Sequence, residues 1–116
     1  MFYKRGHLLL GNNVGVNCNS MIVCHNSISI GENTIMGPGV YIYDHDHLFD
    51  SNTGVSRLDY KSSPISIGKN CWIGGGCIIL RGTTIGDNCL VAAGSIIKGV
   101  YPNGSVIIQK REDMIL

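Results

Sequence analysis

The sequence lacks any long apolar run, and no stretch approaches the roughly 18 residues that a helix needs to cross a bilayer. It also lacks a dominant charge, since nine basic residues stand against eight acidic ones and the net charge is +1. This balance argues against nucleic acid or an anionic membrane as the main partner. The N-terminal apolar run is too short for a signal peptide, so a cytoplasmic protein without a membrane span is expected.

Alanine is scarce, whereas the 116 residues include 16 glycines and many Ile, Val and Asn. Such a composition disfavours helices and favours short strands joined by tight turns. We expect one domain over residues 1–116, by the usual prior of length. A chain this short buries only about two-thirds of its unfolded surface, so it would gain stability from a partner subunit.

The five cysteines form no Cys-x-x-Cys pair, which argues against a zinc ribbon or finger. Their spacing is instead built on six: Cys18 and Cys24 are six apart, as are Cys71 and Cys77, and Cys89 lies twelve further on. A fixed short period is the mark of a solenoid.

An aliphatic residue recurs every six positions in the second half of the chain, at Ile67, Ile73, Ile79, Ile85, Val91 and Ile97. Four positions after each of the first five comes a small residue, namely Cys71, Cys77, Thr83, Cys89 and Ser95. Period six fits neither a helix nor a hairpin. It predicts a solenoid in which aliphatic residues fill the interior and small ones pack at the corners. These cysteines are therefore interpreted as small buried residues, without a redox or metal role.

The first half carries the same period less cleanly. Leu10, Val16, Ile22 and Ile28 are six apart, and the spacing resumes after a two-residue offset at Ile30, Met36 and Ile42. The pattern then stops until Ile67, and residues from about 43 to 64 are predicted to be a loop outside the solenoid. Long loops in compact domains are usually functional. The residues from about 107 to 116 are expected to form a short C-terminal tail.

The loop begins with Asp44-His45-Asp46-His47. This cluster fits a metal site, a catalytic base with its support, or a polar loop. A neutral imidazole is suited to take a proton near pH 7.

The run "PISIGKNCWIGGGCIILRGTTIGDNCLVAAGSII" resembles the hexapeptide-repeat acyltransferases, in particular the galactoside and maltose O-acetyltransferases and their polysaccharide-acetylating relatives. The resemblance covers about residues 10 to 106. It implies a left-handed parallel β-helix, an exception to the usual right-handed crossover. It also implies a homotrimer with active sites between subunits, and direct acetyl transfer from acetyl-CoA to a hydroxyl of a sugar or polysaccharide precursor.

The resemblance also implies a loop histidine as the general base. The family's histidine falls five positions after the last interior residue, Ile42, which matches His47. We therefore rank His47 before His45 as the catalytic residue. Asp44 and Asp46 would then orient the imidazole or bind the acceptor.

By the same resemblance, Trp72 lies beside the catalytic cleft and the Gly75 N–H faces the thioester carbonyl, where an oxyanion develops. Ala93 would contact the pantetheine arm of the cofactor by its backbone. Cations should collect near the coenzyme A phosphates, and the candidates are Lys98, Lys110 and Arg111, with Arg81 and Lys69 less favoured. The Gly-Asn-Pro-Ala turn of the relatives is absent here.

For the acceptor, Asn17 is the best match to a sugar-binding asparagine of the relatives, and His25 stands where they have a nearby aspartate. Their N-terminal segment has no counterpart in this sequence. Either the acceptor site is more open, or the chain is a shortened form.

Two other classes stay open: a non-catalytic or degenerate β-helix scaffold, and a γ-class carbonic anhydrase with three histidines on zinc. The spacing His45-x-His47 is not that of the anhydrases, so no metal is expected.

Overall fold

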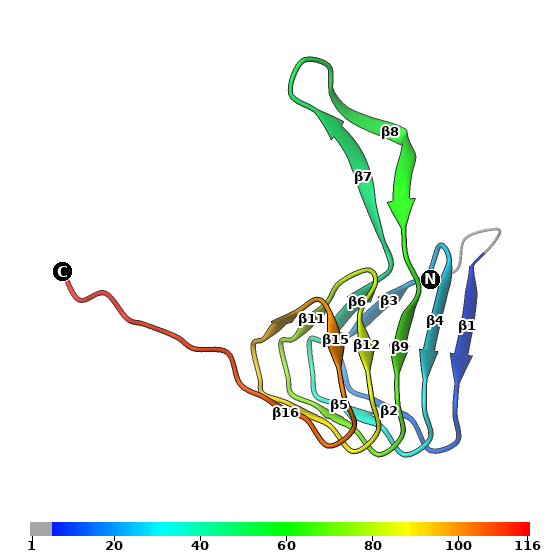
Figure 1. Cartoon of the computed structure of the whole chain (residues 1–116), viewed down its shortest axis with the longest axis vertical. Helices are drawn as coiled ribbons and strands as arrows, with labels where there is room; N and C mark the ends of the chain where they lie inside the picture. The colour runs from blue at the N-terminus through cyan, green and yellow to red at the C-terminus, as the bar shows by residue number, and fades with distance from the viewer. Residues whose placement is uncertain (1–5) are drawn as a thin grey trace.

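The computed structural model describes residues 6–116, and this part of the chain consists of strands and turns without a helix. The strands form parallel sheets that wrap around one shared interior as a β-solenoid of about five turns (Figure 1). The all-β solenoid predicted from the six-residue period is therefore confirmed.

Each turn of the solenoid passes through three sheets in succession. The first sheet contains β1 (His7–Leu10), β4 (Ser27–Ile30), β9 (Ile65–Ile67), β12 (Thr84–Ile85) and β15 (Val100–Tyr101). The second sheet contains β2 (Gly15–Val16), β5 (Ile35–Met36), β10 (Trp72–Ile73), β13 (Leu90–Val91) and β16 (Val106–Ile107). The third sheet contains β3 (Met21–Val23), β6 (Tyr41–Tyr43), β11 (Ile78–Ile79) and β14 (Ile96–Ile97).

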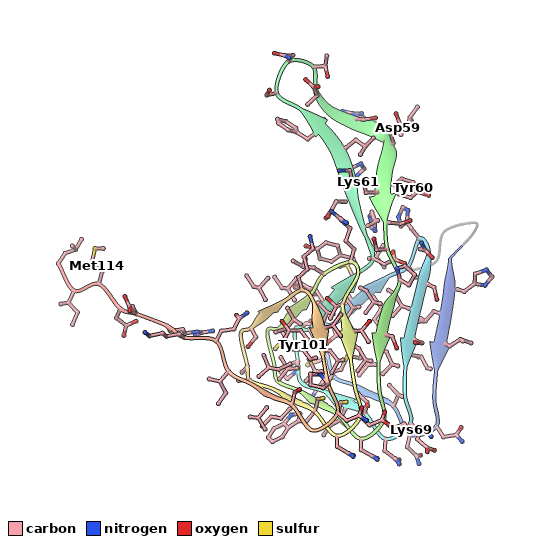
Figure 2. All side chains as sticks on the ribbon, viewed as in Figure 1. Asp59, Tyr60, Lys61, Lys69, Tyr101 and Met114 are labelled. Atoms are coloured by element: carbon pink, nitrogen blue, oxygen red, sulfur yellow. The ribbon has the colours of Figure 1, made fainter. Side chains whose placement is uncertain are left out.

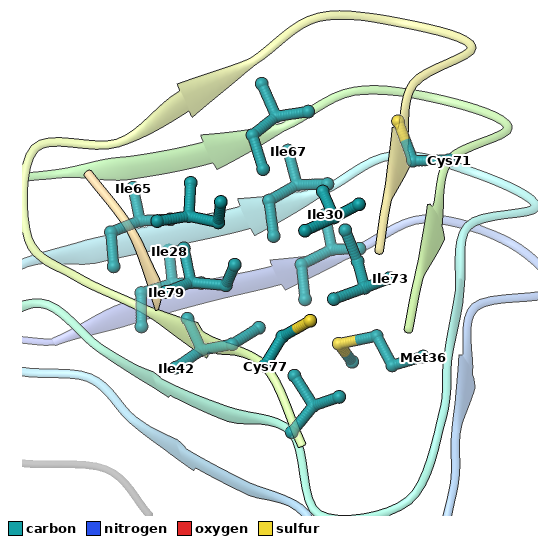
Figure 3. Packing of buried hydrophobic residues seen from close by; sticks show 14 of the residues in the cluster. Ile28, Ile30, Met36, Ile42, Ile65, Ile67, Cys71, Ile73, Cys77 and Ile79 are labelled. Carbon is teal, nitrogen blue, oxygen red and sulfur yellow. The ribbon is translucent and has the colours of Figure 1, made fainter. Parts of the chain in front are cut away.

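The interior is filled by the aliphatic residues of the repeat, as the sequence predicts (Figure 3). All six repeat residues from Ile67 to Ile97 are buried. The parallel register stacks the apolar residues of successive turns on one another. Ile73, for example, lies beside Met36 on one side and Val91 on the other. A β-branched side chain suits this stacking because its rotamers are few and its shape fills the pleat.

The two-residue offset in the first half has a simple cause. Strand β4 is four residues long and turns both Ile28 and Ile30 into the interior. Its partners across the register are Leu8 and Leu10 of β1 and, on the other side, Ile65 and Ile67 of β9. The first sheet is thus wider than the others at this end of the solenoid.

The small repeat residues lie in the corners and bond the next turn. Cys71 Sγ lies 3.1 Å from Gly86 O, and Cys77 Sγ lies 3.1 Å from Ala92 O. The Thr83 hydroxyl donates in the same way to Ile97 O. Burial raises the pKa of the Cys71 thiol, so this sulfur is held as a neutral donor.

The corners turn sharply because several residues adopt a left-handed backbone. Asn70 has φ of 55° and Gly76 has φ of 71°. Asparagine and glycine are the residues that enter this region at least cost. The abundance of both types in the sequence is explained by these corners.

One element leaves the solenoid. After β6, the strands β7 (His45–Asp50) and β8 (Gly54–Ser62) pair antiparallel and form a hairpin that projects from the body (Figure 1). The chain then re-enters the first sheet at β9, in register with β4. After β16, residues 108–116 have no regular secondary structure and lead away from the solenoid.

Ile73→Ala should lower the free energy of unfolding by about 2–5 kcal/mol, because the stacked interior residues cannot move together to fill the cavity that the truncated side chain leaves. Ile108→Ala is the matched control, since Ile108 is 74% exposed, and it should change stability by less than about 0.5 kcal/mol. Denaturant unfolding at one fixed protein concentration measures both. Equal effects of the two substitutions would contradict the stacking role of Ile73.

Candidate functional site

Asp44 anchors the root of the hairpin to the turn below it. Its buried carboxylate accepts three backbone N–H bonds, from His25 at 2.8 Å, Asn26 at 2.7 Å and Ser27 at 2.9 Å. Bonds between N–H groups and a charged acceptor are among the stronger ones in proteins. Because Asp44 is 0% exposed, its carboxylate does not face solution, and of the two roles expected for it, orienting an imidazole or binding the acceptor, the first fits this burial better.

His45 follows directly and stacks on His25 of the preceding turn. The ring centroids are 3.6 Å apart, and Tyr60 of β8 meets His25 edge-on with centroids 4.5 Å apart. His45 Nδ1 lies 3.8 Å from the Asp44 carboxylate. Only 16% of the His45 side chain is exposed, so this imidazole is part of the packed root of the hairpin.

His47 lies further out on β7 and is exposed. Its Nδ1 is 3.0 Å from the carbonyl oxygen of Ser56 on β8. A carbonyl only accepts, so Nδ1 carries the proton in this bond, and the neutral ring keeps its lone pair at Nε2. The Ser56 hydroxyl bonds both the N–H and the carboxylate of Asp59, which holds this part of β8 in shape.

Asp46 lies between the two histidines and forms an ion pair with Arg81. The Arg81 Nε is 2.6 Å from Asp46 Oδ2. Arg81 belongs to the turn between β11 and β12, one solenoid turn after the hairpin. Lys98 is exposed in the next turn along, after β14. These residues share one edge of the third sheet with the hairpin root, which we name the hairpin corner.

A groove of about 430 Å³ lies at the other edge of the third sheet, where the chain passes over from the second. We name this edge the groove corner. The groove contains three of the predicted cofactor-binding residues: Trp72, Gly75 and Ala93. Its remaining lining is apolar or glycine, namely Gly37, Pro38, Gly74, Leu90, Val91 and Ala92. A Cβ added to Gly75 would come 3.1 Å from Pro38 O, so glycine keeps this wall open.

The tail after β16 passes this same corner. The Gln109 side chain bonds both backbone groups of Ile96 at the edge of the third sheet. Arg111 Nη2 then donates to Gly94 O at 3.1 Å, next to Ala93. Lys110 is exposed on the same segment. Two of the three predicted cations therefore lie at the end of the groove corner, whereas Lys98 lies at the hairpin corner.

Asn17 follows β2 and also belongs to the groove corner, at the first turn of the solenoid. It is exposed, and its Oδ1 accepts the N–H of Cys18 at 2.7 Å. One chain thus carries its predicted site residues as two separate groups. The groove corner has Asn17, Trp72, Gly75, Ala93, Lys110 and Arg111, and the hairpin corner has Asp44, His45, Asp46, His47 and Lys98.

Within residues 6–116, no group of three or more His, Cys, Asp or Glu side chains is placed to hold a metal ion. None of the described residues forms a helix long and apolar enough to cross a membrane.

Residues 64–98 match the family model described as the hexapeptide repeat of succinyl-transferase. The match covers β9 to β14, where the interior ladder is most regular. Over these residues the chain carries the repeat of the hexapeptide-repeat proteins. The galactoside O-acetyltransferase of Escherichia coli K12 is 38% identical over 88% of this chain and 50% of its own length. A putative lipopolysaccharide biosynthesis O-acetyl transferase of the same organism is 31% identical over 90% of this chain and 58% of its own length.

Solved structures of hexapeptide-repeat proteins give the same fold. A Vibrio cholerae acetyltransferase complexed with acetyl coenzyme A matches 83% of this chain and 52% of its own, with 29% identity and a TM-score of 0.76. A maltose O-acetyltransferase of Clostridium difficile matches 82% of this chain and 51% of its own, with 37% identity and a TM-score of 0.67. The chain spans about half the length of the curated relatives that it matches.

Four residues on or beside the hairpin were not assigned from the sequence in the roles that the structure gives them. Ser56 and Asp59 form a Ser-x-x-Asp motif, a spacing that does signal a local side-chain cap. Tyr60 and Arg81 have no such signal, because their partners are 35 residues away in the sequence. Only the folded register brings Tyr60 to His25 and Arg81 to Asp46.

The stacked His25 makes stability depend on pH. Its pKa is lowered, first by burial and then by the neighbouring His45. The unfolded chain therefore takes up the proton more readily than the folded one, and stability falls as pH drops below the ordinary histidine value of about 6.5. His25→Phe keeps an aromatic ring without the titration, and it should reduce the loss of Tm between about pH 7.5 and about pH 5.5. His7→Phe, at an exposed position of β1, is the control. An unchanged pH dependence in His25→Phe would contradict this role.

Proposed function

We propose that the chain forms the catalytic solenoid of an O-acetyltransferase that moves an acetyl group from acetyl-CoA to a hydroxyl of a sugar or a polysaccharide precursor. The observation that carries the proposal is the single groove that contains Trp72, Gly75 and Ala93. The names of the relatives, among them a structure complexed with acetyl coenzyme A, support it. Acetyl-CoA is a cytoplasmic metabolite, so the reaction is proposed for the cytoplasm.

The thioester would lie against Gly75. Its neighbours use their N–H groups inside the solenoid, since Gly74 donates to Val91 O and Gly76 donates to Pro38 O. Among the described residues no acceptor is found for the N–H of Gly75. That N–H is therefore available to the oxyanion that develops on the thioester carbonyl. The pantetheine arm would follow the groove past Ala93 towards Arg111 and Lys110, whose charges suit the phosphates.

His47 is the proposed general base. The bond from Nδ1 to Ser56 O fixes the tautomer in which Nε2 accepts a proton. As the acceptor oxygen attacks the thioester carbon, Nε2 takes the hydroxyl proton. The C–S bond breaks, the ester forms on the acceptor, and the proton passes to the departing thiolate. His45 ranks second because its ring is packed between His25 and the root of the hairpin.

The site is proposed to form between subunits of a homotrimer. In one chain, strand β6 separates the groove corner, which precedes it at Pro38, from the hairpin corner, which follows it at Asp44. A second copy would have to bring its groove to the first copy's hairpin. The outer faces of the second and third sheets suit such contact, because they carry ladders of exposed apolar residues: Ile35, Trp72 and Val106 on one, and Met21, Tyr41 and Ile96 on the other. In the first sheet the outward ladder runs Leu9, Ser29, Ser66, Thr84 and Val100, so its three middle residues are polar and only its two ends are apolar.

His47→Ala should lower kcat for acetyl transfer by about 100-fold to 10,000-fold, the usual contribution of a general base. The Kd for acetyl-CoA should stay unchanged, since the groove is intact. Transfer to a panel of sugars and nucleotide sugars, with calorimetry for binding, measures both. Greater loss in His45→Ala would reverse the ranking of the two histidines, and a folded trimer that binds no acetyl-CoA would favour the scaffold alternative.

Subunit mixing tests the shared site. Ala93→Phe should block the groove and His47→Ala should remove the base, so each homotrimer should be inactive. Mixed trimers from coexpression should regain about a quarter of wild-type activity, because one intact hairpin then meets one intact groove at about one interface in four. Without any recovery, the two groups would have to act within one chain.

A further inference from the structure

The turn between β11 and β12 contacts both strands at the root of the hairpin. Arg81 of this turn bonds Asp46 on β7 through Nε at 2.6 Å. The next residue, Gly82, donates its N–H to Ser63 O, just after β8, at 3.3 Å. The Arg81 side chain is 25% exposed and the Asp46 side chain 49%, so the ion pair lies at the surface with its guanidinium partly covered.

Asp46 is flanked by the two histidines of the site. Successive side chains of a strand point to opposite faces, so Asp46 lies on the face of β7 away from His45 and His47. A group that binds Asp46 on that opposite face can therefore fix the strand, and with it the direction of the two imidazoles, without filling the space on the face where the imidazoles lie. The Asp44 carboxylate fixes only the first residue of the root. Arg81 fixes the strand two residues further on, directly before His47.

We propose that Arg81 is a positioning residue, which holds the hairpin through Asp46 and thereby aims His47 at the acceptor. This role rests on the proposed function. It also assigns Arg81 to the hairpin instead of the coenzyme A phosphates. With Asp44 buried and Asp46 paired, both carboxylates of the Asp44-His45-Asp46-His47 segment serve the frame of the site. The acceptor is then bound by other groups.

The test uses Arg81→Gln, Asp46→Asn and the exchanged pair Asp46→Arg with Arg81→Asp, each in the full chain. Lys61 has an exposed side chain (Figure 2), but its backbone lies in β8 opposite Asp46 of β7. Cleavage after Lys61 by a lysine-specific protease therefore requires the hairpin to open and reports that opening. Each single variant should raise this cleavage rate about two- to tenfold, the range expected for loss of one ion pair of this kind. The kcat should fall about tenfold or more, because small misplacements of a base are costly, with the KM for acetyl-CoA unchanged. The exchanged pair should recover a large part of both.

Glu32→Gln is the matched control. It removes the exposed pair between Lys69 and Glu32, whose groups are 3.6 Å apart, and Lys69 lies at the end of the body away from the hairpin (Figure 2). This variant should leave the Lys61 cleavage rate and kcat unchanged.

The outcomes separate the two proposals. Wild-type cleavage rates in Arg81→Gln and Asp46→Asn would overturn the positioning role of Arg81. Faster cleavage with an unchanged kcat would overturn it as well. A wild-type protein that binds acetyl-CoA but transfers no acetyl group would contradict the proposed function. The cleavage rates of the variants would still decide whether Arg81 holds the hairpin.

Discussion

The whole molecule depends on the in-register stacking of one interior side chain on the next. Parallel strands of two to four residues are too short to be stable alone, and each gains its stability from the turns above and below. Backbone bonds such as Trp72 N–H to Cys89 O and Ile78 N–H to Ser95 O fix the spacing between turns. The aliphatic ladder then fills the interior that this spacing creates. Because every outer position is tied to this frame, corners of successive turns lie directly over one another.

The alignment of corners brings the residues of each group of the candidate site together. Groups that are 18 residues apart, such as Gly75 and Ala93, become neighbours along one groove. On the other edge of the third sheet, the same alignment places Arg81 beside the root of a hairpin that left the solenoid one turn earlier. A stiff scaffold thus keeps polar residues at defined positions although they lie in turns and in an inserted hairpin. Such stiffness would suit the direct transfer proposed above, since two substrates would have to be aligned at once.

The sequence was most informative where the structure is local and repetitive. The six-residue period predicted the interior residues from Ile67 to Ile97 and the buried corners such as Cys77, because each turn repeats the same environment. For the candidate site, the sequence indicated which residues belong to it but not how they are arranged in space. No spacing rule shows that Asp44 turns inward to cap residues 25–27, or that Asp46 pairs with Arg81, because these contacts depend on which turn lies over which. The separation of Trp72 from His47 within one chain likewise follows from the fold alone.

The hairpin is inserted without altering the register of the solenoid. Strand β9 pairs with β4 as though residues 44–63 were absent, and the chain leaves and returns at one point that is closed by the bond from Ser63 N–H to Asp44 O. The scaffold therefore places few demands on the length or sequence of what lies between these two residues. Over evolutionary time, insertions and exchanges at this point can diversify what the protein recognises, while the ladder beneath goes on folding in the same way.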